Sequence, residues 1–129
     1  MIIIKRKEIE AVLQLPGERR YRYFIKRVAD ASKLWGLWND GWATGITDDG
    51  QQTMPVWPAP EYADLCRLGD WKDYTPKDIE LHYFMEEFLP NLIREGVRVS
   101  IFDTPSEDTV IINDSELIDD LKEELSKME

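Results

Sequence analysis

Apolar residues recur at steps of three and four along the first quarter of the chain, and this spacing predicts two helices. The first spans 5–14 and ends at Pro16-Gly17, a pair that breaks helices. The second spans 18–32 and carries apolar residues at helical spacing, namely Tyr21, Phe24, Ile25, Val28 and Ala29. Basic side chains occupy its opposite face, so we predict an amphipathic helix.

Short apolar runs separated by turn sequences follow, and they predict strands over 34–38, 42–47 and 52–57. The separating sequences are Asn39-Asp40-Gly41 and Asp48-Asp49-Gly50, whose residues tolerate positive φ. The three strands are therefore predicted to form a meander. Pro55 cannot donate a ladder hydrogen bond, so its strand is expected to lie at an edge or to break there.

The rest of the chain alternates helical and extended patterns. We predict helices over 60–68, 82–95 and from residue 113 or 114 onward, a brief extended piece over 79–81, and a hairpin of strands 97–101 and 110–112. Pro90 is expected to kink or split the helix that contains it.

Together these elements predict one α+β domain over residues 1–129. Its antiparallel sheet would hold about five short strands, a meander plus a hairpin, with helices at both chain ends and between the strand groups. A chain of 129 residues can bury roughly two-thirds of its unfolded surface, so it needs no disulfide or metal to fold.

Composition narrows the class of protein. The chain is 43% hydrophobic and 33% charged, which argues against a membrane protein and against a disordered chain. Its one cysteine, Cys66, allows no intrachain disulfide, and the apolar run at residues 1–4 is too short for a signal peptide. These features predict a cytoplasmic protein.

Charge is unevenly distributed along the sequence. The net charge is −10, yet residues 1–33 hold nine Lys and Arg against four Asp and Glu, which leaves −15 for the remainder. The negative net charge repels nucleic acid and anionic membranes, so we expect neither as a partner, whereas the asymmetry could orient a protein partner or a second copy of the chain. The alternative is that both regions are ordinary solvated surface.

Catalytic and cofactor motifs are missing from the sequence. One Cys and one His cannot build a Cys/His zinc site, the Asp-Gly turns fail the EF-hand pattern, and no Gly-x-Ser-x-Gly or phosphate-binding glycine motif occurs. We therefore predict no catalytic residues, no metal and no cofactor. A Cys66–His82 couple is conceivable, but Cys66 lies between Leu65 and Leu68, where a buried, unreactive thiol is the expectation.

Four tryptophans, Trp35, Trp38, Trp42 and Trp57, fall in the predicted meander. Strand alternation places Trp35 and Trp38 on opposite sheet faces, so we expect at least one exposed ring, while the others pack under a helix. Exposed tryptophan is typical of binding surfaces. The candidate binding residues are Trp38, Trp42, Trp57, Tyr62, Arg20 and Asp49, with a possible pocket walled by Trp42, Trp57 and Tyr62 and rimmed by Arg20 or Asp49.

Several strings share their order with a known family: residues 18–28, Trp35-Gly36-Leu37, Gly41-Trp42-Ala43, Val56-Trp57-Pro58, Glu61-Tyr62-Ala63, the 84–96 segment and Phe102-Asp103-Thr104-Pro105. In these the chain resembles the bacterial family catalogued as domain of unknown function 2750. That resemblance implies a fold but no activity. A weaker similarity, through Pro55 and Trp57-Pro58, is to the N-terminal domain of enhanced-serine-sensitivity proteins, which hints at protein binding.

The sequence thus favours a small uncharacterised bacterial protein that acts as a non-enzymatic protein-interaction module, with a protein partner or by self-association. One alternative is a small-ligand binder or enzyme with an aromatic pocket. Another is an antitoxin or immunity-like inhibitor whose acidic surface binds a basic partner.

Overall fold

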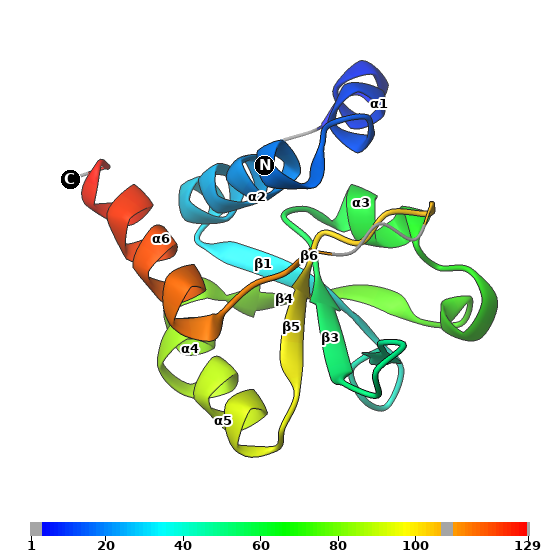
Figure 1. Cartoon of the computed structure of the whole chain (residues 1–129). Helices are drawn as coiled ribbons and strands as arrows, with labels where there is room; N and C mark the ends of the chain where they lie inside the picture. The colour runs from blue at the N-terminus through cyan, green and yellow to red at the C-terminus, as the bar shows by residue number, and fades with distance from the viewer. Residues whose placement is uncertain (1–3, 107–109, 129) are drawn as a thin grey trace.

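The computed structural model describes residues 4–106 and 110–128 and shows helices arranged around a bent sheet (Figure 1). The helices are α1 (Arg6–Leu13), α2 (Gly17–Ala31), α3 (Pro60–Leu65), α4 (Leu81–Tyr83), α5 (Leu89–Arg94) and α6 (Asp114–Ser126). The strands are β1 (Lys33–Trp38), β2 (Gly45–Ile46), β3 (Gln52–Val56), β4 (Thr75–Glu80), β5 (Arg98–Ile101) and β6 (Val110–Ile111). The predicted α+β class is confirmed.

Two groups of strands make up the sheet. Strand β1 pairs antiparallel with β4, and the second group has the order β2-β3-β5-β6. A bridge joins the groups, because Trp35 N–H donates to the Trp57 carbonyl at 2.9 Å and Trp57 N–H donates to the Trp35 carbonyl at 2.7 Å. The sheet therefore continues from β4 and β1 into β3.

The predicted meander of three successive strands is only partly correct: β2 and β3 form the expected antiparallel hairpin, with Gly45 opposite Thr53, but β1 does not pair with β2. The turn at residues 39–41 does reverse the chain, yet it yields only a Trp38–Trp42 bridge, because β4 and Trp57 occupy the two edges of β1. Strands β3 and β5 run parallel, so the sheet is not wholly antiparallel either. Parallel neighbours need a long crossover, which here includes α3, β4 and the 81–94 helical run.

One smaller prediction about strands is confirmed, because the hairpin of β5 and β6 is antiparallel, with Ser100 opposite Ile111. The prediction for Pro55 is wrong: β3 lies between β2 and β5 and continues through Pro55, which is opposite Ser100. The missing N–H is tolerated because pairing on the other side of β3 passes from Thr53, opposite Gly45, to the Trp57 bridge and skips Pro55.

Proline also shapes the helical run over 81–94. Pro90 cannot donate to the carbonyl one turn earlier, and the run widens into a π-helical turn over Phe84–Phe88 just before it. The run is thus divided into α4, this turn and α5, which confirms the prediction that Pro90 kinks or splits the helix.

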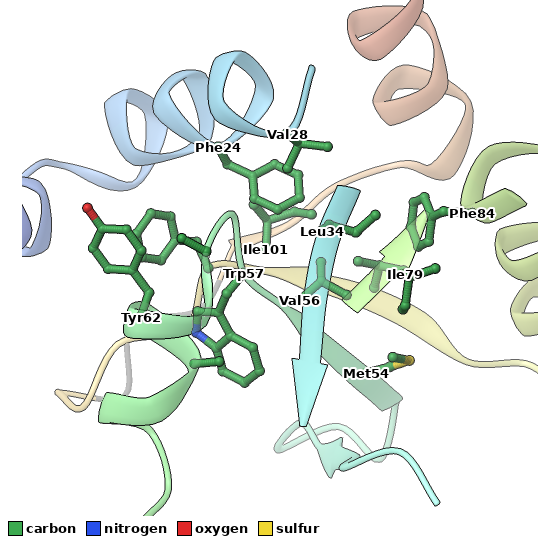
Figure 2. Close-up of a cluster of buried hydrophobic side chains, with 14 of the residues drawn as sticks. Phe24, Val28, Leu34, Met54, Val56, Trp57, Tyr62, Ile79, Phe84 and Ile101 are labelled. Atoms are coloured by element: carbon green, nitrogen blue, oxygen red, sulfur yellow. The ribbon is translucent and has the colours of Figure 1, made fainter. Parts of the chain in front are cut away.

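The core lies between α2 and the sheet. Figure 2 shows Phe24 and Val28 extending from α2 toward Ile101 and Leu34, and all four are buried. Burying each such side chain contributes about 1.5–3 kcal/mol. Helix α6 packs beside α2, where the Tyr21 hydroxyl donates to Asp120 Oδ2 at 2.6 Å. The amphipathic prediction for α2 is confirmed by this buried face.

Candidate functional site

Aromatic side chains gather at the surface where β1 ends, against the π-helical turn. The Trp38 and Trp42 ring centroids lie 5.0 Å apart at an interplanar angle of 76°, and Phe88 lies 5.7 Å from Trp42. Tyr83 lies 6.2 Å from Phe88 and is 52% exposed. We call Trp38, Trp42, Tyr83 and Phe88, together with Lys77, the aromatic patch.

A turn and a glycine position Trp42 in this patch. Asp40 adopts a φ of +55° in the turn, and the Ala43 N–H donates to the Leu37 carbonyl at 2.8 Å, which folds Trp42 back over β1. The indole then fills the space above Gly36, where an added Cβ would meet two ring carbons at 2.9 Å. A residue without a side chain at position 36 is therefore required for this packing.

Lys77 supplies the charge of the patch. It lies directly opposite Gly36 in the β1–β4 register, so its side chain is on the same face as Trp38 and Trp42. Its ammonium lies 4.0 Å from the Trp38 ring centroid and 5.7 Å from that of Trp42. Both distances are within the range of a cation–π interaction.

Two other predicted site residues, Trp57 and Tyr62, lie in the core, as Figure 2 shows. Trp57 is fully buried, and its indole N–H donates to the Asp103 carbonyl at 2.9 Å. Tyr62 stacks edge-on against Phe102 with centroids 4.7 Å apart. Neither ring contacts Trp42 among the described ring pairs, so these three residues are not brought together.

Arg20 and Asp49 are also placed apart from the patch. Arg20 is 2% exposed, and its guanidinium donates to the carbonyls of Phe102 and Leu15, both at 3.1 Å. Asp49 is exposed in the β2–β3 turn, where the Thr47 hydroxyl donates to it and lowers the pKa of its carboxyl. The structure thus brings together only Trp38 and Trp42 of the six candidates.

An open groove of about 390 Å³ lies on another part of the molecule. It is lined by Cys66, Leu68, Gly69, Trp71, Asp103, Thr104 and Pro105. The buried residue just before Asp103, Phe102, has a φ of +58°, which is strained for a bulky side chain. Strain of this kind is concentrated at functional sites, so the groove is a second candidate.

Cys66 in this groove is not an activated nucleophile. Burial, together with the nearby negative charge of Asp103, raises the pKa of its thiol to about 12. The thiol contacts the Asp103 carbonyl at 3.4 Å, whereas the His82 ring is exposed beside Glu80. The structure shows no contact between Cys66 and His82 in the part of the chain that it describes.

A cluster of titratable side chains joins α1, α2 and α3. The Tyr23 hydroxyl donates to Glu8 Oε2 at 2.5 Å, and Arg27 donates to Glu8 at 2.7 Å and to the Tyr23 oxygen at 3.0 Å. Since the Tyr23 proton is given to Glu8, the Tyr62 hydroxyl at 2.9 Å is the donor to Tyr23. The hydrogen bond from Tyr23 lowers the pKa of Glu8, opposed by partial burial and helped by the charge of Arg27. The cluster is engaged in holding α1 in place.

Within residues 4–106 and 110–128, no three acidic, His or Cys side chains are grouped so as to hold a metal ion. No helix in the same residues has the length and apolarity needed to cross a bilayer.

Sequence reasoning missed three members of the aromatic patch: Lys77, Tyr83 and Phe88. Lys77 was not recognised because β4 begins in a polar stretch without apolar alternation. Phe88 follows Phe84 and Met85 at helical spacing, which indicates a core stripe and gives no sign that one ring reaches the surface. Knowledge of the β1–β4 register would have shown that these residues lie beside Trp38 and Trp42.

Comparison with known proteins identifies a family for the chain but no activity. No curated protein matches the chain, and no solved structure matches it. The sequence profile of the family described as protein of unknown function DUF2750 matches residues 21–121, a range that contains the aromatic patch and the residues that line the groove. Since this range is well over half of the 129 residues, the chain belongs to the DUF2750 family.

Proposed function

We propose that this protein is a non-enzymatic interaction module of the bacterial cytoplasm and that the aromatic patch is its contact surface. The observation that carries the proposal is that Tyr83 is 52% exposed beside half-buried Phe88, Trp42 and Trp38. Large aromatic rings supply most of the binding energy at protein interfaces when a partner covers them. One exposed ring beside three partly exposed rings supports a partner-binding role.

Site-specific photo-cross-linking in the source cell tests this proposal. A photoreactive phenylalanine analogue is placed at position 83 in one variant and, as the control, at position 93 in another. Ile93 is 49% exposed on α5 and is not part of the aromatic patch. The proposal predicts a discrete cross-linked protein, either another protein or a second copy, from position 83 only.

The same experiment is repeated with Trp38→Ala, which is expected to abolish the cross-link because it removes one ring of the patch. Equal cross-linking from positions 83 and 93, or none from position 83, would contradict the proposal. A circular dichroism spectrum of each variant verifies that it is folded.

A narrower version is an immunity-like inhibitor that binds a basic partner. It is supported by the charge of −15 on residues 34–129 and by the acidic stripe of α6, which includes Asp119 and Glu123. Such binding is electrostatic, so it is predicted to weaken as salt rises. An affinity that does not change with salt would contradict the immunity-like inhibitor but not the interaction module.

The groove supports a second candidate, the binding of a small ligand. Its volume of about 390 Å³ falls within the range of ligand sites, and Trp71 and Thr104 give it an aromatic wall and a hydroxyl. A thermal-shift screen with metabolites and nucleotides tests it, with Trp71→Ala as the variant that should lose any stabilisation. No stabilisation of the wild-type protein by any compound would remove this candidate.

A further inference from the structure

We infer that Trp38 and Trp42 form a two-walled aromatic cage for the ammonium group of a partner's lysine side chain, and that Lys77 occupies this cage in the free protein. The inference rests on the proposed function, since it takes the aromatic patch as the contact surface. It adds the chemistry that the patch recognises and a residue that competes with the partner.

The two indole rings have the arrangement of cage walls. Their interplanar angle of 76° makes them adjacent, nearly perpendicular surfaces with centroids 5.0 Å apart. Trp42 is held in this position because its ring packs directly over Gly36 and lies edge-on to the ring of Phe88, with centroids 5.7 Å apart. The faces of aromatic rings carry negative potential, so two such walls attract a cation.

The cage already contains a group of the proposed kind. The Lys77 ammonium lies 4.0 Å from the centroid of Trp38 and 5.7 Å from that of Trp42. Among the described salt bridges Lys77 has no carboxylate partner, so the two rings are what hold its charge. The side chain is exposed, and a cation–π contact at an exposed site is weak enough to be exchanged for another cation.

The other face of the same strand shows what an incomplete cage looks like. The Lys33 ammonium lies 5.7 Å from the Trp35 ring centroid, and Lys33 also forms a salt bridge with Asp78 at 3.7 Å. No second ring stands beside Trp35 among the described ring pairs. Trp35 and Lys33 therefore provide a matched control within the chain.

The net charge of the molecule favours a basic partner. The chain as a whole carries a net charge of −10. This field draws positively charged side chains toward the molecule, and the cage would give one of them a specific position.

The test uses tetramethylammonium chloride as the probe and the indole N–H signals of the five tryptophans as the readout in ¹H–¹⁵N NMR spectra. The Lys77→Met variant removes the resident ammonium but keeps a chain of similar length. We expect the Trp38 and Trp42 signals to shift during the titration, with about threefold to tenfold tighter binding in Lys77→Met than in the wild type. Sodium chloride at equal concentration corrects for ionic strength.

Three further arms make the test decisive. Trp38→Leu in the Lys77→Met background is expected to lose the response, whereas Trp35→Leu keeps it. The neutral analogue 3,3-dimethylbutan-1-ol is expected to bind at least several-fold more weakly, since it lacks the charge.

The inference would be overturned if neither indole signal responds in either protein, if the neutral analogue binds equally well, or if Lys77→Met binds the cation no more tightly than the wild type. Cross-linking from position 83 is measured separately. If tetramethylammonium does not bind but position 83 still cross-links to a partner, the cage is refuted and the interaction module is not. If tetramethylammonium binds but position 83 gives no cross-link, the interaction module is refuted.

Discussion

At the scale of single residues, Gly36 determines where Trp42 can lie. An alanine Cβ there would meet Trp42 ring carbons at 2.9 Å and the Met54 methyl at 3.2 Å. We predict that Gly36→Ala lowers the free energy of unfolding by about 1–3 kcal/mol, as overpacking does, and weakens the near-ultraviolet circular dichroism of the Trp38–Trp42 pair.

Gly41→Ala is the matched control, because a Cβ at Gly41 meets nothing within 4 Å. Its effect on urea unfolding is expected to stay within about 0.5 kcal/mol. Equal losses in the two variants would show that the fit of Trp42 over Gly36 is not the cause.

Cys66 gives a second prediction at this scale. With its thiol pKa raised to about 12, the reactive thiolate near pH 8 is about 10³-fold scarcer than for an ordinary thiol of pKa about 8.5. Reaction of the folded protein with a chromogenic disulfide is therefore expected to be at least about tenfold slower, since the greater nucleophilicity of a thiolate of high pKa offsets part of its scarcity. Reaction of the folded protein as fast as that of the denatured protein would contradict the assignment of Cys66 as an unreactive thiol.

Single residues also show how far the sequence could predict the site. Alternation correctly places Trp35 and Trp38 on opposite faces, since Trp35 pairs with Asp78 and Trp38 with Thr75. It could not reveal that Trp57 is fully buried, because that depends on the bridge to Trp35 and on packing near Trp71. Burial of a large ring is decided by partners distant in sequence.

At the scale of elements, Glu8 attaches α1 to α2 through Tyr23 and Arg27. The pKa of Glu8 is lower in the folded protein than its ordinary value of 4.5. Its contribution to stability is therefore fully present above about pH 4.5 and is lost as the pH falls through the lower, folded pKa.

Glu8→Gln is accordingly expected to unfold at lower urea concentration than the wild type near neutral pH, with the difference shrinking under acidic conditions. Glu10→Gln is the control, because among the described residues Glu10 pairs only with Arg6 of the same helix, at the exposed surface. A difference for Glu8→Gln that grows toward low pH would contradict the assignment.

Elements with strong local signals were predicted well, and those without were not. Helix α6 begins at Asp114, as the sequence predicts, and Asn113 caps it, since its side chain accepts a hydrogen bond from the Ser115 N–H at 2.9 Å. In place of β4 the sequence predicts only a short extended piece near Ile79. The first residues of the strand, 75–78, have neither apolar alternation nor β propensity as a group. Tertiary pairing with β1 makes this segment a strand.

At the scale of the whole molecule, the composition of layers follows from the sequence but the strand order does not. The helical and extended segments suffice for an α+β class, whereas the parallel β3–β5 pair joins Thr53 to Arg98, which are separated by about a third of the chain. Local turn signals favour pairing between sequence neighbours, which is why they gave a meander. The aromatic patch depends on the same long-range pairing, since Lys77 reaches Trp38 only through the β1–β4 register.

The central claim is that the aromatic patch binds a partner, and calorimetry with the cross-linked partner tests it most directly. The account predicts that Trp38→Ala weakens the affinity at least about 30-fold, the loss of roughly 2 kcal/mol typical of an interface hot spot. Trp35→Ala, on the opposite sheet face, is predicted to change it less than about threefold. Equal effects of the two substitutions, or an unchanged affinity for Trp38→Ala, would contradict the account.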